Sequence, residues 1–395
     1  MTSVDKDLRR ACLPRPVACL AGAAALVLCG CVYETAPSPS TSSSTRSGGG
    51  SAEALLTERQ QAFQIDHDAY ASLGYQIDWR GFPVVARGRR ISFLDVYPDI
   101  VVAQESGATV SILEANTGAL RNSSQVASPL TRFVGNFRDE NRLIVSSDTE
   151  AYVIDIETGS VVERQEFSRV VSTRPVFFAN QKIYGTAIGH VYSHYMNPPV
   201  DAWAYDLGSP IDADPVLVGS TVVAVSRRGD IAMLDGASGT LMARTSIYGG
   251  CEADPVAGDG VVFFASLDQS IYAIDLGGRQ VWRVRTEQPL RVTPTHHAGV
   301  LYVPSADQGL RALDAGTGAQ LWNQEQVQGR VVAVRNGRLV TWDGTTAATI
   351  DPANGDVIAS TGLTDVAMLT PDQFVDGNLY AASNGGIVAK FQPRD

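Results

Sequence analysis

The stretch Gly299-Val-Leu-Tyr-Val-Pro-Ser-Ala-Asp-Gln-Gly-Leu-Arg-Ala-Leu-Asp-Ala-Gly-Thr-Gly-Ala-Gln-Leu-Trp322 contains one full copy of the pattern that decides the fold. Apolar residues alternate with other residues in the runs 299–305 and 310–314, and a third run ends at Trp322. Alternation with a period of two residues predicts β-strands, and the polar and Gly-containing segments between the runs predict tight turns. The stretch therefore predicts several short strands joined by short turns.

This pattern recurs about every forty residues, most clearly as an acidic residue that, in five of six copies, is followed by Gly four positions later. The acids are Glu114, Asp155, Asp235, Asp275, Asp314 and Asp351, and the glycines are Gly118, Gly159, Gly239, Gly318 and Gly355. Intervals of 41, 80, 40, 39 and 37 separate the acids, so the double interval predicts a degenerate copy near Met196, interrupted by Asn197-Pro-Pro199. Roughly four short strands per forty-residue copy predict the blades of a β-propeller.

The number of copies predicts the number of blades. Seven copies fall near 114, 155, 196, 235, 275, 314 and 351, and an eighth begins at Gly386–Phe391. The eighth copy ends before its outer strand, whereas Tyr75–Trp79 resembles an outer strand that lacks a blade. We therefore expect an all-β fold over 75–395, an eight-bladed propeller of four-stranded antiparallel blades. Pairing of its N- and C-terminal strands would close the ring and remove exposed sheet edges.

The repeated residues are expected to have structural roles. Each acid is placed to accept hydrogen bonds from the amides of the following turn, and Gly adopts the positive φ that the turn requires. The tryptophans at the fourth-strand position, which are expected to dock neighbouring blades, are Trp79, Trp203, Trp282 and Trp322. We expect none of these residues to be catalytic.

The N-terminus has the order of charges and apolar residues that is typical of a secretory signal. Arg9, Arg10 and Arg15 precede the apolar run 17–28, and Leu28-Cys-Gly-Cys31 resembles a bacterial lipobox. The resemblance implies a lipoprotein signal peptide over 1–30 and lipidation of Cys31. An ordinary signal peptide with an incidental Cys is the alternative. Val32 in place of Asp favours sorting to the outer membrane.

Two further segments precede the propeller. Residues 31–51 comprise the lipidated Cys and a Ser-, Pro- and Gly-rich stretch that predicts a disordered tether. Residues 52–74 predict one amphipathic helix, because Leu56, Phe63 and Tyr70 are spaced seven apart. Its apolar side packs either on the propeller or on a partner.

Composition limits the kinds of partner and of chemistry. The 395 residues include 31 Lys and Arg against 42 Asp and Glu, and the net charge of −11 disfavours binding to nucleic acid. Beyond Cys31 the chain has Cys251 alone, which excludes an internal disulfide. A small buried residue, rather than a catalytic thiol, is the expected role of Cys251.

The histidines do not predict a metal site. His190 and His194 fall in an expected strand, where residues four apart are separated by about 13 Å along the chain. His296 and His297 lie in an expected turn, where adjacent side chains are normally solvated.

Two acidic tripeptides are candidates for paired carboxylates at the mouth of the central channel. Asp212-Ala-Asp214 and Glu252-Ala-Asp254 precede Pro at equivalent positions, and paired carboxylates are the groups that an acid/base site requires. The equivalent residues in two other copies are Arg174 and Thr293. This mixed set favours capping of strand ends and salt bridges over catalysis.

The repeat resembles the pyrroloquinoline-quinone-like (PQQ-like) propeller repeat. With the lipobox and eight blades, the chain resembles the BamB family of outer-membrane lipoproteins. The resemblance implies a monomeric, non-catalytic scaffold that binds another cell-envelope protein during outer-membrane β-barrel assembly. It also implies an outer-membrane location facing the periplasm, or the cell surface, with membrane contact through the lipid anchor alone.

Two other functions stay open. One is a PQQ-dependent, quinoprotein-type periplasmic enzyme, and the other is a ligand- or carbohydrate-binding propeller at the cell surface. In quinoproteins of similar architecture, PQQ is held by a disulfide between adjacent cysteines, a tryptophan floor and ligands to Ca²⁺. The segment after Cys31 has no Cys-Cys pair. We therefore expect no cofactor, no bound metal and no enzymatic activity.

Overall fold

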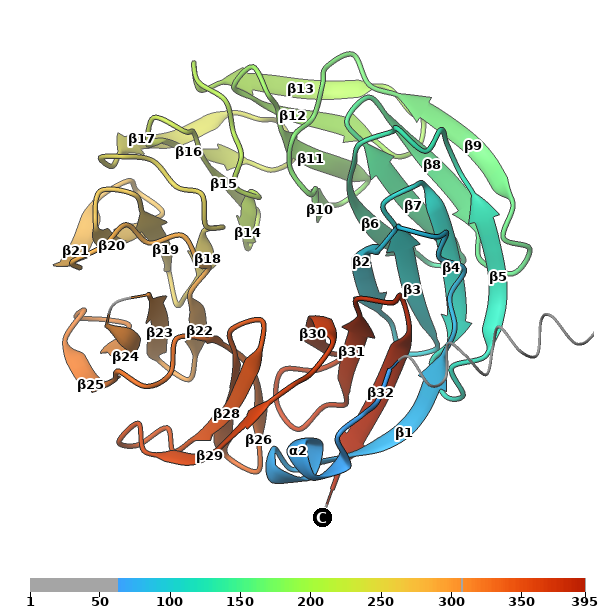
Figure 1. The fold of residues 1–395 in the computed structure, drawn as a ribbon. Helices are drawn as coiled ribbons and strands as arrows, with labels where there is room; N and C mark the ends of the chain where they lie inside the picture. The colour runs from blue at the N-terminus through green and yellow to red at the C-terminus, as the bar shows by residue number, and fades with distance from the viewer. Residues whose placement is uncertain (1–62, 307, 395) are drawn as a thin grey trace, which may run out of the picture. The chain divides into compact units, whose positions relative to one another are not determined.

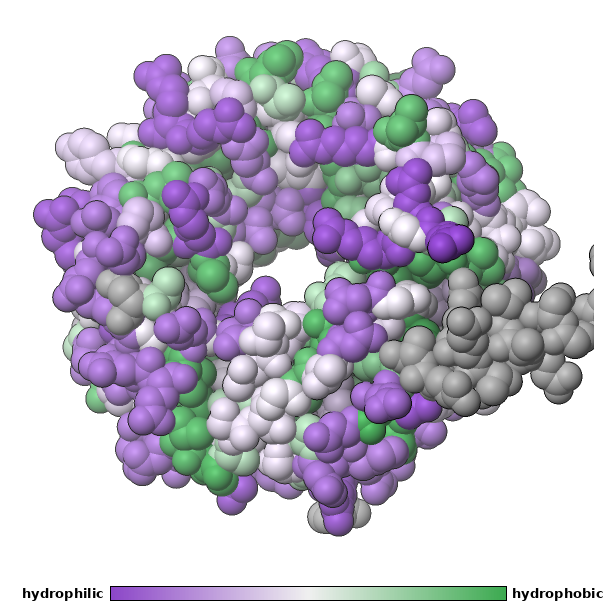
Figure 2. All heavy atoms as spheres, viewed as in Figure 1, coloured by the Kyte–Doolittle hydropathy of each residue, from purple (hydrophilic) through white to green (hydrophobic). Residues whose placement is uncertain are grey.

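A computed structural model of the chain describes residues 63–306 and 308–394, which all belong to one compact unit, 51–395. Its strands form eight antiparallel sheets of four strands each, arranged as blades around a central opening (Figures 1 and 2). The all-β, eight-bladed propeller is therefore confirmed. No helix within the described ranges has the length and hydropathy of a membrane span.

The blades follow the chain in order, and each begins at the channel and ends at the outer rim. Blades 1 to 4 consist of β2 (Ile91–Val96), β3 (Ile100–Glu105), β4 (Thr109–Glu114) and β5 (Leu120–Gln125); β6 (Phe133–Asp139), β7 (Arg142–Ser147), β8 (Glu150–Asp155) and β9 (Val161–Glu166); β10 (Val176–Phe178), β11 (Gln181–Gly185), β12 (His190–Tyr195) and β13 (Asp201–Asp206); and β14 (Val216–Val218), β15 (Thr221–Val225), β16 (Asp230–Asp235) and β17 (Leu241–Ser246). The degenerate copy near Met196 thus forms blade 3.

Blades 5 to 8 complete the ring. They consist of β18 (Val256–Ala257), β19 (Val261–Ser266), β20 (Ser270–Asp275) and β21 (Gln280–Arg285); β22 (Thr295–His297), β23 (Val300–Ser305), β24 (Gly309–Asp314) and β25 (Gln320–Gln324); β26 (Arg330–Arg335), β27 (Arg338–Trp342), β28 (Thr346–Ile350) and β29 (Val357–Gly362); and β30 (Val366–Pro371), β31 (Leu379–Ser383) and β32 (Val388–Pro393) with β1 (Tyr75–Gly81).

The burial of each strand follows from its place in the blade. The second and third strands are buried on both faces, as in β15 and β16, because a neighbouring blade covers each face. The fourth strands alternate between partly buried and exposed residues, as in β29. Runs of apolar residues therefore mark the middle of a blade, and alternating runs mark its rim.

The predicted closure of the ring is seen in the last blade. The strand β1 pairs antiparallel with β32, from Tyr75 opposite Pro393 to Gly81 opposite Val388. In Figure 1 the blue β1 therefore lies beside the red β32. The C-terminal strand has hydrogen-bonded neighbours on both sides, and the edge that the truncated eighth copy would expose is covered.

Every fourth strand contains a β-bulge one residue before the position that contacts the next blade. The bulged residues are Asp78, Arg121, Val162, Ala202, Met242, Val281, Leu321 and Ile358. A bulge bends and twists its strand, and here it turns the next side chain toward the following blade. Five of these bulges expose a large apolar residue at the outer rim, 40–58% accessible.

The predicted helix over 52–74 is wrong for its described part, where only α2 (His67–Ser72) is helical. Asp66 ends the helix on its N-terminal side, because its Oδ1 accepts hydrogen bonds from the amides of Asp68 and Ala69, 3.0 and 3.1 Å away. Phe63 and Ile65 precede this cap without helical structure. Residues 52–62 lie outside the described residues.

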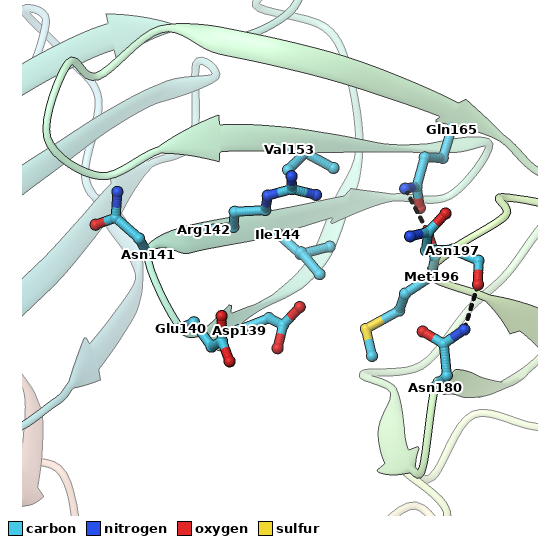
Figure 3. A pocket seen from close by; sticks show the side chains of 10 residues that line it. All are labelled: Asp139, Glu140, Asn141, Arg142, Ile144, Val153, Gln165, Asn180, Met196 and Asn197. Carbon is cyan, nitrogen blue, oxygen red and sulfur yellow. Dashed lines mark hydrogen bonds between the residues drawn. The ribbon is translucent and has the colours of Figure 1, made fainter.

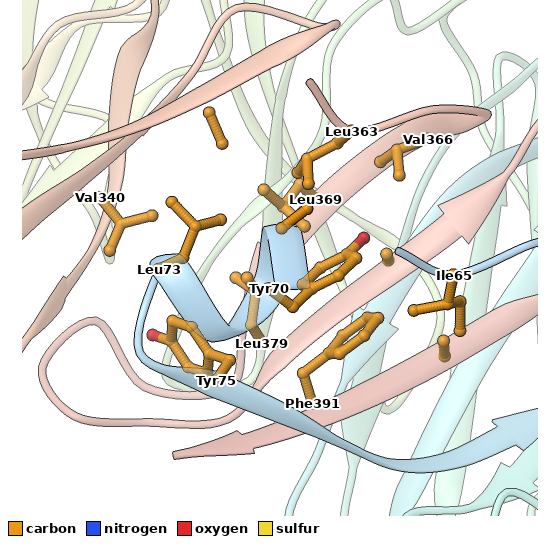
Figure 4. Close-up of a cluster of buried hydrophobic side chains, with 14 of the residues drawn as sticks. Ile65, Tyr70, Leu73, Tyr75, Val340, Leu363, Val366, Leu369, Leu379 and Phe391 are labelled. Carbon is orange, nitrogen blue, oxygen red and sulfur yellow. The ribbon is translucent and has the colours of Figure 1, made fainter. Parts of the chain in front are cut away.

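The segment around α2 packs on the propeller, so the apolar side chains of this part of the predicted helix are covered by the chain itself. The Tyr70 ring stacks on Phe391 of β32, with centroids 3.6 Å apart. Phe63 and Leu73 are buried in the same cluster, which includes Leu379 of β31 and is shown in Figure 4. The spacing of Phe63 and Tyr70 reflects burial against blades 7 and 8 rather than one helical stripe.

Candidate functional site

The acidic repeat residues are engaged in turns, each in its own blade. The Asp155 carboxylate accepts hydrogen bonds from the amide and hydroxyl of Thr158, at 2.8 and 2.9 Å. Asp235 makes the same bonds with Ser238, and Asp314 with Thr317. These hydrogen bonds hold the carboxyl pKa of each of the three aspartates below its usual value.

The other repeat acids have different hydrogen-bond or ion-pair partners. Asp275 accepts from the amide of Arg279 at 2.8 Å, and Asp351 accepts from the amide of Ala353 at 2.8 Å. Glu114 instead forms an ion pair with Arg121 at 2.6 Å. Because these acids lie in different blades, the structure brings no two of them together as an acid/base pair.

Trp–Gly pairs hold neighbouring blades together. The Nε1 of Trp282 donates to the carbonyl oxygen of Ala315 in the next blade at 2.9 Å, and its ring lies against Gly318. A Cβ at Gly318, whose φ is 74°, would lie 2.8 Å from that ring. Trp79 pairs with Gly118, Trp203 with Gly239 and Trp322 with Gly355 in the same way, whereas Gly159 lies against Asn122. The tryptophans therefore lie in the outer strands, between blades, and not around the central channel.

The residues before the repeated prolines form a hydrogen-bonded series that runs from blade to blade around the channel. The Arg174 amide donates to Asp214 at 2.7 Å, and the Asp214 amide donates to Asp254 at 2.8 Å. The Asp254 amide donates to the hydroxyl of Thr293 at 3.1 Å. Each side chain thus caps the strand entry of the preceding blade, which is the structural alternative foreseen for the acidic tripeptides.

The electrostatics of this series agree with an internal role. Burial and the nearby Asp254 charge raise the pKa of Asp214 to about 6. The Arg174 guanidinium lies 3.6 Å from Asp95, which also accepts from Asn136 at 2.9 Å. Burial lowers the pKa of Arg330. Asp214 and Asp254 are adjacent in the series, but each accepts a hydrogen bond from a backbone amide of the preceding blade, so both carboxylates are engaged in holding blades together.

The histidines and the cysteine are also built into blades. His190 and His194 lie in β12 as predicted, and His194 is 1% exposed. The expectation that His296 and His297 lie in a turn is wrong, because they form part of β22, where their rings contact Phe263 and Phe374. No group of three His, Cys, Asp or Glu side chains within 63–306 and 308–394 is arranged to hold a metal.

Cys251 does not have the surroundings of a reactive thiol. It is 3% exposed, and burial raises the pKa of its thiol to about 12. Blade packing therefore accounts for this residue, in line with its expected role.

A cavity of about 300 Å³ lies between blades 2 and 3, beside the degenerate copy (Figure 3). Polar side chains such as Asp139, Arg142 and Gln165 line it, together with Met196 from the interrupted turn. Gln165 also accepts a hydrogen bond from Lys182, which is fully buried and whose pKa burial lowers to about 8. This blade interface is polar because Lys182 stands where the other copies carry an apolar residue.

Apolar side chains open to a partner lie on loops that enter blades or join their second and third strands. Leu130, Val170 and Ile188 are 90%, 49% and 63% exposed. Backbone hydrogen bonds join their loops into one surface, from Asp148 to Arg132, from Val171 to Asp148 and from Ala187 to Val170. We call Leu130, Val170 and Ile188 the loop patch.

Two structural residues could not be singled out from the sequence. Arg335 ties blade 7 to both ends of the propeller chain, and Lys182 lies buried between blades. The detectable signal for Lys182 was a charge inside an otherwise apolar run, Gln181–Gly185. For Arg335 there was no such signal, because two of its acceptors are the backbone carbonyl oxygens of Gly74 and Arg394, which are far away in sequence. Cys31 lies outside the described residues.

Comparison with known proteins agrees with the fold. The family model described as outer membrane protein assembly factor BamB matches residues 106–247, 197–289 and 227–394. The outer membrane protein assembly factor BamB of Bordetella pertussis is 25% identical over 137 residues, 34% of this chain and 35% of that protein. The match thus spans about a third of this curated relative.

Two solved structures share the propeller fold. The crystal structure of BamB from Moraxella catarrhalis has a TM-score of 0.62 at 18% identity, covering 78% of this chain and 97% of that one. The computationally designed Ika8 protein has a TM-score of 0.67 at 16% identity, covering 80% and 99%. Because the matches of the family model together extend from residue 106 to residue 394, the chain belongs to the BamB family of outer membrane protein assembly factors.

Proposed function

We propose that the protein is a non-catalytic scaffold of the cell envelope that binds another component of outer-membrane β-barrel assembly. The observation that carries the proposal is the loop patch, which offers apolar side chains on a rigid ring. Isolated exposed apolar residues are common on proteins, but three on hydrogen-bonded loops form a surface suited to a partner. Family membership indicates what kind of partner to seek.

The acidic side chains form hydrogen bonds within the propeller, which supports a scaffold over a catalyst. The repeat acids hold turns, and the acids at the channel cap strands of neighbouring blades. A general acid or base must lie within hydrogen-bonding reach of a substrate and exchange a proton with it. These carboxylates instead accept hydrogen bonds from the protein's own backbone. The four tryptophans of the fourth strands lie between blades, which leaves them unsuited to serve as a floor for a quinone.

The proposed arrangement in the envelope follows from the N-terminal sequence. A signal peptide over 1–30 directs export, the lipid on Cys31 anchors the chain to the outer membrane, and residues 31–51 tether the propeller in the periplasm as a monomer. Residues 52–74 lead into the propeller at 75–395. The tether gives the loop patch freedom to reach a membrane-embedded partner.

The test is mild cross-linking of cells that express the tagged full-length protein, followed by solubilisation, affinity isolation and mass spectrometry. The proposal predicts enrichment of β-barrel assembly components, and a Leu130→Asp/Ile188→Asp variant should lose that enrichment. A Met242→Asp/Ile358→Asp variant, changed at the outer rim, should retain it. Stoichiometric uptake of added PQQ and Ca²⁺ by the purified protein, or enrichment of polysaccharide enzymes, would instead support the other functions.

A further inference from the structure

A groove crosses the inner strand of blade 1 on the face that carries the loop patch. Two hollows, of about 490 and 190 Å³, meet at Ser92 of β2. The larger one extends to Arg90, Met368 and Asn384, toward blade 8. The smaller one extends past Phe93, Thr131 and Arg132 to Phe133, in blade 2. We call the two hollows together the β2 groove.

The β2 groove has an unpaired arginine at each end. Arg90 and Arg132 are exposed, and neither forms an ion pair with any residue in the described ranges. Elsewhere on the same face, Arg227 pairs with Asp212 at 2.6 Å and Arg283 with Asp268 at 2.7 Å. In a chain of net charge −11, two exposed arginines that form no ion pair within the described ranges provide a local site for negative charge.

The single acid that lines the groove does not neutralise these arginines. Glu105 is 3% exposed. Its carboxylate accepts hydrogen bonds from the Ala86 amide at 2.8 Å and from the Thr109 hydroxyl at 2.6 Å. The charge of Glu105 is therefore held by donors inside blade 1.

The rest of the groove combines hydroxyl donors with apolar walls. Ser92 and Thr131 supply hydroxyls, and Phe93 and Met368 supply apolar surface.

We propose that the β2 groove binds an extended acidic peptide segment of a partner protein. Carboxylates pair with Arg90 and Arg132 at the two ends, and an apolar side chain lies between them against Phe93 or Met368. A planar membrane surface fits a concave site of this kind poorly, which favours a peptide over lipid headgroups. The inference deepens the proposed function and rests on it only in assigning the peptide to a protein partner.

The test uses the purified protein and a fluorescein-labelled peptide of about twelve residues that repeats Asp-Leu-Ser, long enough when extended to cross the groove. Fluorescence anisotropy is measured with this peptide and with the matched Asn-Leu-Ser peptide. The acidic peptide should bind about tenfold more tightly than its neutral match. The Arg90→Glu/Arg132→Glu variant should abolish this preference, whereas Arg338→Glu, which changes an exposed arginine on the opposite face, should preserve it.

A second variant tests the groove without changing its charge. Ser92→Trp fills the point where the hollows meet and should weaken acidic-peptide binding about tenfold, with an unchanged circular dichroism spectrum. The proposal would be overturned if the acidic peptide did not bind, or if Arg338→Glu weakened its binding as much as Arg90→Glu/Arg132→Glu does. It would also be overturned if the Arg90→Glu/Arg132→Glu variant lost binding to phosphatidylglycerol vesicles but kept its preference for the acidic peptide. Because no assembly component is present, failure here leaves the cross-linking test of the proposed function unaffected.

Discussion

The Nε of Arg335 donates a hydrogen bond to the carbonyl oxygen of Gly74, 261 positions earlier in the chain, at 3.1 Å. The same guanidinium donates to the carbonyl oxygen of Arg394 at 2.5 Å and to Asp376 at 3.1 Å. Arg335 belongs to blade 7, whereas Gly74 precedes β1 and Arg394 follows β32. One side chain therefore attaches both ends of the closing blade to its neighbour.

Removing this attachment should destabilise the propeller. Arg335 is 7% exposed, so Arg335→Met removes a buried donor and its hydrogen bonds to Gly74, Asp376 and Arg394. The free energy of unfolding should fall by about 2–4 kcal/mol, measured by urea titration. Arg338→Met, at an exposed arginine three positions away, should change it by less than about 0.5 kcal/mol. Equal effects of the two variants would contradict the role of Arg335.

Blade docking is tested by two glycines of similar backbone conformation. Gly318 has φ 74° and Gly337 has φ 70°, but a Cβ would meet the Trp282 ring only at Gly318. Gly337→Ala should cost roughly 1–2 kcal/mol of unfolding free energy from backbone strain alone. Gly318→Ala adds the clash between blades and should cost at least about 1 kcal/mol more. Thermal unfolding of both variants checks this difference, and equal melting temperatures would contradict docking.

The raised pKa of Asp214 predicts how the effect of its replacement on the free energy of unfolding depends on pH. The folded-state pKa, about 6, lies above the usual value, so the ionised carboxylate destabilises the fold as pH rises from about 4 past 6. Asp214→Asn keeps an oxygen for the Arg174 amide without that charge. The variant should exceed the wild type in unfolding free energy by about 1–3 kcal/mol at pH 7.5, and the gain should vanish near pH 4.

The control for this prediction is Asp212→Asn, which removes an equal charge from the same loop. Asp212 is exposed and pairs with the exposed Arg227. Its replacement should change stability by at most about 1 kcal/mol, without the pH dependence. Urea titrations at the two pH values provide the comparison. A pH-independent effect of Asp214→Asn would contradict the proposed burial of charge.

The lipid anchor is tested at Cys31. Cys31→Ser removes the thiol that would carry the lipid, so the protein should move from the detergent phase to the aqueous phase in Triton X-114 partition of cell lysates. Incorporation of labelled palmitate should be lost in the same variant. A Cys29→Ser variant is the matched control and should keep both properties. Membrane partition that is unaffected by Cys31→Ser would show that another segment holds the protein.

The fold was predictable because a repeat signals it many times over. Asp314, Gly318 and Trp322 belong to one copy, and their equivalents in other blades carry the same local information about turns and docking. Even the closing pair was visible, because the lone outer strand at Tyr75 matches an incomplete last copy. Local patterns of this kind do not depend on knowing which residues meet in space.

The predictions that failed depended on tertiary contacts. Phe63 and Tyr70 have helical spacing, but Asp66 caps a shorter helix, and the side chains are buried against blades 7 and 8. His296 was assigned to a turn because it lies between Pro294 and Gly299, yet pairing with β23 makes it part of a strand. The β2 groove was invisible for the same reason, since residues of four blades line it.

Site-specific photo-cross-linking in living cells tests the central claim most directly. A photoreactive amino acid placed at Ile188 in the loop patch, and separately at Ile358 on the outer rim, reports which surface touches a partner. We expect an adduct between the Ile188 position and an outer-membrane β-barrel assembly component, with none from Ile358. Adducts of similar yield at both positions, or adducts at Ile188 with only unrelated proteins, would contradict it.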